Sequence, residues 1–247
     1  MLCECPVPLD NAVASRRIYS PLAYARVRDM PIAPIVHSES FRLASWFPIV
    51  WRRSSAVPDL VAVRSFLPDS RAQPPGVRAS VSVLPLALQA YPFVLDPAAP
   101  PGPDSTRMFD DVVADAPTDV GASVTTTDNK LSLATELRLQ ALELFAQHFP
   151  LTEAVGQTLA ELDLFEPWEL KFNISGTSIE LPDLLIVRQK SLDTGALAPV
   201  LYRHGLVAAH LIGVHRISLF RAGILLAAAR AVLHGETSAE SGASDDG

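Results

Sequence analysis

The chain has 247 residues and a formal net charge of −7, with 49% hydrophobic and 19% charged residues. This composition excludes a disordered chain, which would be rich in charge and poor in apolar residues, and area scaling predicts that folding buries about 70% of the surface. The length fits one large domain or two small ones. The excess of acidic residues argues against a nucleic-acid partner, because proteins that bind nucleic acids are usually basic.

The only two cysteines, Cys3 and Cys5, lie together near the N-terminus. A lone C-x-C pair cannot crosslink a domain of this size and is a poor zinc site, so we predict no metal and a reducing compartment, the cytoplasm. The opening residues include an acid and prolines where a signal peptide needs basic and then apolar residues, so we expect no cleavable export signal. We expect residues 1–17 to be a flexible segment, 18–234 a single domain and 235–247 a disordered acidic tail.

The first half predicts short strands separated by proline-rich loops. Residues 45–52 and 59–66 are apolar runs of strand length, rich in aromatic and β-branched side chains. Pro48 inside the first run predicts an edge strand or a bulge. Residues 78–83 alternate between apolar and polar, which predicts a half-buried strand. Residues 109–128 carry five aspartates without the spacing of a calcium loop, and this pattern predicts a solvated loop.

Helical periodicity begins in the middle of the chain. Thr135 is the predicted cap of a helix that ends before Pro150, and Thr152 begins a second helix that runs to about Leu164. A tight corner is expected between the two helices. The apolar stripe of the first helix consists of Leu137, Ala141, Leu142, Leu144 and Phe145.

A β-hairpin is predicted next. Residues 168–174 and 177–181 both alternate between apolar and polar side chains, and Ser175-Gly176 between them suits a two-residue turn. Residues 184–187 are apolar and could add a third strand.

The last third, residues 196–233, is predicted to be helical with a break near His204-Gly205, because an unbroken rod would approach 57 Å. The second piece is apolar on almost every side, so we expect the central helix of the core or the seam of a homodimer, and the sequence leaves both open. Its three arginines and two histidines argue against a transmembrane helix. The longest uninterrupted apolar run, residues 222–229, covers only about 12 Å, which is far short of a bilayer.

No catalytic constellation is evident. The sequence lacks the G-x-S-x-G nucleophile turn, the phosphate-binding G-x-x-x-x-G-K-[ST] loop and the G-x-G-x-x-G dinucleotide turn. His204 and His215 are about 16 Å apart along a helix and cannot share a metal. His37-Ser38-Glu39 has the H-x-E form that begins an iron facial triad, which keeps an iron-dependent enzyme open as an alternative, although Ser40-Phe41 favours a helix start there.

Aromatic residues cluster in the strand-rich half, namely Trp46, Phe47, Trp51, Tyr91 and Phe93. Ordinary core packing is one interpretation. The other is an aromatic groove that binds a peptide, since Trp and Tyr combine a large apolar area with a polar tip. We take Trp46, Trp51, Tyr91 and Phe93 as the expected recognition face and add His210 of the last helix to the candidate binding residues.

The order of several short segments resembles the bacterial SapC family. The segments that carry the resemblance are Tyr24-Ala25-Arg26, Ser38 to Phe41, Phe47-Pro48-Ile49-Val50, Tyr91-Pro92-Phe93, Phe109-Asp110 and Ala209-His210-Leu211. The resemblance as a whole covers about residues 18 to 230. The sequence departs from the family pattern at Ala90, where arginine is usual, after the acidic turn, which lacks its glycine, and at residues 191–195.

The resemblance implies a cellular context for the protein but no catalytic reaction. The family name refers to bacterial surface layers, and members are also labelled peptide-transport permeases. The permease label conflicts with the short apolar run and the arginines of the last helix, which argue against a transmembrane segment. Family members are often encoded near tryptophan halogenases and cupin-like oxygenases. The family has no established catalytic residues, so the resemblance assigns none here.

The sequence as a whole predicts an α+β fold, with an antiparallel, strand-rich N-terminal half, a later β-hairpin and C-terminal helices that include a buried long helix. We expect a soluble accessory protein that binds a peptide or a partner protein, without a cofactor and without catalysis. An iron-dependent oxygenase-like enzyme and a structural protein of the surface layer are the alternatives.

Overall fold

The computed structural model describes residues 3–10, 12–54, 57–68, 70–78, 80–174 and 176–243. Its strands are β1 (Pro6–Pro8), β2 (Arg17–Ile18), β3 (Ile32–Pro34), β4 (Ile49–Arg52), β5 (Asp59–Val63), β6 (Phe93–Leu95), β7 (Arg107–Asp110), β8 (Ala122–Ser123), β9 (Phe165–Pro167), β10 (Leu170–Ile174), β11 (Thr177–Leu181) and β12 (Leu184–Val187). Its α-helices are α1 (Ala25–Arg28), α2 (Ser40–Ala44), α3 (Pro75–Arg78), α4 (Leu86–Gln89), α5 (Leu133–Glu161), α6 (Gln189–Asp193), α7 (Ala198–Ser218) and α8 (Ala222–Ala243). Short 3-10 turns connect several of them.

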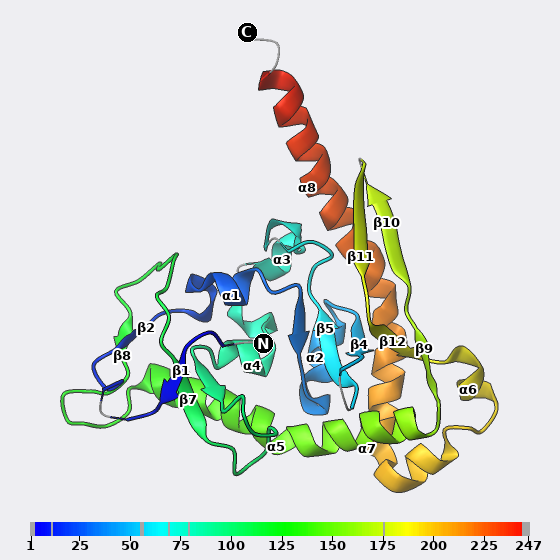
Figure 1. The fold of residues 1–247 in the computed structure, drawn as a ribbon, viewed down its shortest axis with the longest axis horizontal. Helices are drawn as coiled ribbons and strands as arrows, with labels where there is room; N and C mark the ends of the chain where they lie inside the picture. The colour runs from blue at the N-terminus through cyan, green and yellow to red at the C-terminus, as the bar shows by residue number, and fades with distance from the viewer. Residues whose placement is uncertain are drawn as a thin grey trace.

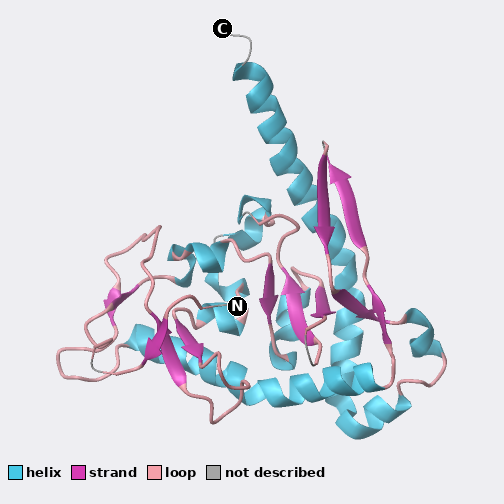
Figure 2. Ribbon diagram, in the orientation of Figure 1, coloured by secondary structure: helices cyan, strands magenta, loops and turns pink. Residues whose placement is uncertain are grey.

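A five-stranded sheet with the order β3-β5-β4-β12-β9 forms the centre of the larger lobe (Figures 1 and 2). All its neighbouring strands are antiparallel. Successive residues of β4 point to opposite faces, so Ile49 and Trp51 enter one core and Val50 enters the other. The first core packs against α2, α5 and α7, and the second packs against the β10–β11 hairpin and α8. Both faces of the sheet are therefore covered, which explains its nearly continuous apolar strands.

A smaller lobe is built on the three-stranded sheet β1-β7-β6 and α4. The long helix α5 connects the lobes, because its first half packs on this sheet and its second half packs on the larger one. Figure 1 shows α5 running beneath both lobes. The mixed helices and antiparallel sheets confirm the predicted α+β class.

The corner predicted at Pro150 is absent, because α5 continues through that residue without interruption. A proline inside a helix loses one hydrogen bond and costs about 3 kcal/mol. Burial on both sides of Pro150 offsets this cost, with Phe145 and Ala146 enclosed before it and Val155 after it. The cap is also displaced from the predicted residue. Ser132 accepts the Thr135 backbone N–H, and Thr135 itself is buried in the first turn.

Two predictions about the strands of the first half are wrong. Strand β4 begins one residue after Pro48 and is central rather than at an edge, so the missing N–H of Pro48 removes no ladder bond. Residues 75–78 and 81–83 are helical turns, so the alternating pattern at 78–83 is not a strand; residue 79 of that pattern lies outside the described residues. By contrast, β10 and β11 pair as the predicted hairpin. Strand β12 has the predicted bounds but pairs with β4 and β9.

The last third is helical and breaks at Gly205, as predicted, with φ = 58° and ψ = −141° at that residue. A second interruption, a 3-10 turn at Leu219–Arg221, separates α7 from α8. The long helix, predicted to lie in the core or at the seam of a homodimer, is buried on one side only. Leu211 and Leu225 face the core, whereas Leu206 and Phe220 are each 87% exposed.

Regular structure reaches close to both ends of the described part of the chain. Within residues 1–17, expected to be flexible, β1 pairs with β7. Helix α8 reaches Ala243, and residues 244–247 of the expected acidic tail lie outside the described residues. The division of the chain into segments stays a prediction.

Candidate functional site

The aromatic residues predicted to form one recognition face do not share a surface. Trp51, Tyr91 and Phe93 are at most 1% exposed, and only Trp46 is partly exposed, at 38%. His210 is exposed on α7, where its ring lies 5.8 Å from that of Phe41. The predicted recognition face is therefore wrong for the three buried residues. Their large apolar side chains gain free energy from burial in the core.

Trp51 belongs to the core of the larger lobe. Its ring packs edge-on against His215 at 5.0 Å, and its indole nitrogen has no hydrogen-bond partner among the described residues. Gly156 of α5 allows this approach, because a Cβ there would lie 3.2 Å from the indole nitrogen and 3.0 Å from the Pro58 carbonyl oxygen. Trp51 therefore sets how closely α5 packs on the sheet.

His215 closes a gap in the sheet between β4 and β12. The register that pairs Leu185 with Trp51 places Val187 opposite Ile49. The His215 ring bridges these two residues, since Nδ1–H donates to the Ile49 carbonyl at 2.6 Å and Nε2 accepts the Val187 N–H at 3.1 Å. Burial lowers the pKa of His215 to about 4, so the ring is neutral at pH 7. This histidine has a structural role in the core.

Tyr91 and Phe93 belong to the smaller lobe. The Tyr91 hydroxyl donates to Asp110 Oδ2 at 2.7 Å, and Phe93 pairs with Phe109 across β6 and β7. The buried Asp110 carboxylate also accepts the Cys5 backbone N–H at 2.7 Å. Desolvation and the hydrogen bond to Asp110 raise the pKa of Tyr91, which keeps the hydroxyl a donor. Asp110 is thus buried and hydrogen-bonded, whereas the sequence pattern predicts a solvated loop there.

The H-x-E segment does not present a ligand set. Glu39 is 4% exposed, and its carboxylate accepts the Val36 N–H at 3.1 Å and the Leu86 N–H at 2.7 Å and pairs with Arg42. His37 Nδ1 is hydrogen-bonded to Thr152 Oγ1 at 3.0 Å. No group of three or more His, Cys, Asp or Glu side chains within the described residues could hold a metal. The geometry of Glu39 therefore argues against the iron-enzyme alternative.

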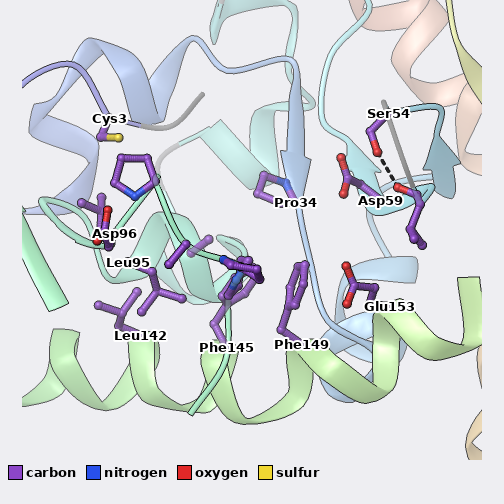
Figure 3. A pocket seen from close by; sticks show the side chains of 17 residues that line it. Cys3, Pro34, Ser54, Asp59, Leu95, Asp96, Leu142, Phe145, Phe149 and Glu153 are labelled. Carbon is purple, nitrogen blue, oxygen red and sulfur yellow. Dashed lines mark hydrogen bonds between the residues drawn. The ribbon is translucent and has the colours of Figure 1, made fainter. Parts of the chain in front are cut away.

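A cleft of about 400 Å³ lies where the two lobes meet above α5 (Figure 3). Its walls come from segments far apart in the sequence: the β4–β5 connection, β6 with the proline-rich loop after it, and α5. The described residues that line it are Cys3, Pro34, Ser54, Val57, Asp59, Ala87, Val94, Leu95, Asp96, Pro97, Ala99, Pro100, Pro101, Leu142, Phe145, Phe149 and Glu153.

The floor of the cleft is one face of α5. Leu142, Phe145, Phe149 and Glu153 follow one another at intervals of three and four residues, which places them along one side of a helix. The Phe145 and Phe149 rings lie 5.8 Å apart, and Figure 3 shows both side chains extending from α5 toward the other lining residues. The floor can therefore bind an apolar or aromatic group.

The charged groups among the described residues around this floor are acidic. Asp59 and Glu153 lie near Phe149, and Asp96 lies at the other end of the cleft, beside Leu95 (Figure 3). Burial raises the pKa of Asp59, and Arg52 at 3.6 Å opposes that shift. No lysine, arginine or histidine is among the described residues that line the cleft. The cleft can therefore bind a group that is both apolar and positively charged.

The sequence contained only part of the signal for this cleft. The apolar stripe of the predicted first helix includes Phe145, but that helix is predicted to end before Pro150. The prediction therefore places Phe149 and Glu153 on different elements, whereas one face of α5 carries both. The proline-rich loop and the β4–β5 connection reach the cleft only through the tertiary fold.

The structure brings together two segments of the family resemblance, since Tyr91-Pro92-Phe93 and Phe109-Asp110 pair through β6 and β7. The sequence model of the SapC family matches residues 13–219 of the chain. The chain belongs to the SapC family. Within this SapC chain, the matched range includes the five-stranded sheet, all of α7 and the described cleft residues other than Cys3, whereas β1 and α8 lie outside it. Comparisons with curated proteins and with solved structures found no match.

Proposed function

We propose that this protein is a non-catalytic accessory protein that binds a peptide or a segment of a partner protein in the cleft above α5. The observation that carries the proposal is the combination of a floor made by Phe145 and Phe149 with three acidic side chains and, among the described residues that line the cleft, no basic one. A ligand that fits has an aromatic or long aliphatic side chain for the floor and an arginine or lysine for the rim.

The size and position of the cleft support a peptide ligand. A volume of about 400 Å³ lies within the range of small-ligand sites and holds a few side chains rather than a folded domain. The floor belongs to a 29-residue helix fixed at both ends in separate cores, so the site is formed before the ligand arrives. A preformed site loses less conformational entropy on binding, which favours affinity for a short segment.

The test uses two hexapeptides, one with a central phenylalanine between two arginines and the other with glutamates in place of the arginines. We expect the basic peptide to bind in the micromolar range by isothermal titration calorimetry and the acidic peptide to bind at least tenfold more weakly. Phe149→Ala should weaken the basic peptide by about tenfold, because it removes half of the aromatic floor. Glu153→Gln should weaken it by about two- to fivefold, as an exposed charge pair predicts.

Glu143→Gln is the matched control, because Glu143 is an exposed acid of the same helix outside the cleft. It should leave peptide affinity unchanged. The proposal fails if neither peptide binds below millimolar concentration, or if Phe149→Ala folds normally by circular dichroism and binds the basic peptide as tightly as the unmodified chain.

A further inference from the structure

A stripe of apolar side chains on α7 and α8 is exposed to solvent. Tyr202 and Leu206 are 95% and 87% exposed, and Ile217 and Phe220 are 72% and 87% exposed. From Leu206 onward the stripe repeats every three or four residues, which keeps it on one side of the helices, and it spans roughly 40 Å. Its members are Leu206, Ala209, Gly213, Ile217, Phe220, Ile224, Ala227 and Ala231. Tyr202 is a further exposed residue that precedes the break at Gly205.

The opposite side of the same helices is fixed to the body. His215 is bonded to the sheet through Ile49 and Val187, and Ser218 accepts the Ile49 N–H at 2.9 Å. Leu225 and Ala229 are fully buried beneath the hairpin of β10 and β11. The helices cannot rotate to bury the stripe without breaking these contacts. The stripe is therefore exposed to solvent in the folded protein.

Charge on this segment differs in sign from that of the whole chain. Residues 198–235 contain four arginines and no aspartate or glutamate, so the segment carries +4 while the remainder, given a total of −7, carries −11. Arg203 and Arg216 also bond to neighbouring elements. The guanidinium groups of Arg221 and Arg230 form no hydrogen bond or ion pair with the part of the chain that the structure describes.

The segment Ala198–Gly235 is also long and apolar enough to cross a membrane by length and composition, and 33% of its most apolar window is buried. Those two properties alone do not separate a spanning helix from a core helix of a soluble protein. The break at Gly205, the 3-10 turn at Leu219–Arg221 and the sheet packed on one side are incompatible with lipid on all sides. A position along the membrane surface satisfies the geometry.

We propose that the exposed side of α7 and α8 binds the surface of an anionic lipid bilayer. Leu206, Ile217 and Phe220 enter the headgroup region, and the arginines beside them contact lipid phosphates, which is the arrangement of interfacial amphipathic helices. A second copy of the chain would cover the same stripe less well. A two-fold contact between two such segments would bring together two positively charged surfaces with no aspartate or glutamate in either segment, whereas lipid phosphates are opposite in charge.

The test is cosedimentation of the full chain with vesicles of phosphatidylcholine and phosphatidylglycerol in equal amounts, compared with vesicles of phosphatidylcholine alone. We expect binding to the anionic vesicles and at least tenfold weaker binding to the neutral ones. Leu206→Glu with Phe220→Glu should reduce binding to the anionic vesicles at least tenfold, because both side chains are exposed and their replacement leaves the core intact. Arg221→Gln with Arg230→Gln should reduce it by about fivefold per arginine.

Val113→Glu with Val120→Glu is the matched control. These valines are 91% and 84% exposed in the loop between β7 and β8, and the pair changes net charge by the same amount as the stripe variant. The control should bind as the unmodified chain does. The proposal is overturned if the chain does not sediment with anionic vesicles, or if the stripe variant and the control lose binding equally. It is also overturned if sedimentation equilibrium finds a lipid-free dimer that the stripe variant dissociates.

Discussion

The bridge that His215 makes between β4 and β12 predicts a specific dependence of stability on pH. The ring is fully buried and must stay neutral to accept the Val187 N–H, and burial lowers its pKa from 6.5 to about 4. Because the folded pKa lies below the unfolded one, the stabilisation is complete above pH 6.5 and is lost as the pH falls toward 4. The shift corresponds to about 3 kcal/mol at 1.36 kcal/mol per pKa unit.

Glu39 opposes this effect. Burial raises its pKa from 4.5 to about 7, outweighing the two backbone N–H groups and Arg42 that favour the ionised form. A raised folded pKa gives the opposite sign, so this stabilisation is complete below pH 4.5 and is lost as the pH rises through 7. Its magnitude is also about 3 kcal/mol. The two slopes nearly cancel, and we expect the free energy of unfolding to change little between pH 4 and pH 7.

Glu39→Gln removes one of the two slopes. The amide cannot ionise, so the variant should lose about 3 kcal/mol of unfolding free energy between pH 7 and pH 4 as the unfolded chain gains a proton on His215. The measurement is urea denaturation followed by circular dichroism at four pH values, for the variant and the unmodified chain. The substitution also disturbs the Leu86 hydrogen bond, but that cost is constant with pH and leaves the slope intact.

An NMR titration of the imidazole supplies the direct check. The reasoning is refuted if His215 titrates near pH 6.5 in the folded protein, or if Glu39→Gln shows the same flat profile as the unmodified chain. His37 and His204 also have pKa values lowered by burial, but they are only partly enclosed. Assignment of the His215 resonance therefore separates its contribution from theirs.

Further predictions concern stability and are each measured by urea denaturation at pH 7. Gly156→Ala should destabilise the chain by about 1 kcal/mol, because the strain of overpacking exceeds the gain in helix propensity, and a stabilised variant would contradict the packing described. Gly213→Ala, in open space on α7, should instead stabilise it by up to about 1 kcal/mol, and a loss would show an unseen contact. Tyr91→Phe should cost about 1–3 kcal/mol by removing a donor from the buried Asp110, and a neutral result would show that water replaces the hydroxyl. Ser132→Ala should cost about 1 kcal/mol as the cap of α5 is lost, and an unchanged stability would place the true cap elsewhere.

Elements determined by neighbouring residues could be predicted from the sequence. The hairpin of β10 and β11 follows from alternation on both sides of a short turn, and the break at Gly205 follows from the length that an unbroken helix would need. The alternation at 78–83 failed because a short alternating run also fits successive helical turns. At Pro150 a local rule predicted an end, but packing of α5 against two cores outweighed the missing hydrogen bond.

The candidate site could not be predicted in the same way, because its parts meet only in the folded chain. Asp59, Asp96 and Glu153 are dispersed over about a hundred residues and reach one cleft through the connection of two lobes. The aromatic cluster failed for a related reason. Residue type shows that Trp51 and Phe93 prefer to be buried, but it does not show which aromatic side chains the fold leaves at the surface.

The two proposed binding sites carry opposite charges, since the cleft is acidic and the segment of α7 and α8 is basic. The net charge of the chain therefore does not predict what either site binds. A chain at −7 is expected to be repelled by an anionic bilayer, yet at physiological salt electrostatic effects extend only about 8 Å. A surface in contact with α7 and α8 therefore interacts mainly with the arginines of that segment, while the acidic cleft attracts positive groups at the junction of the lobes. Peptide binding in the cleft depends on Phe149 and Glu153, and lipid binding depends on Leu206 and Phe220. Each proposal can therefore fail while the other holds.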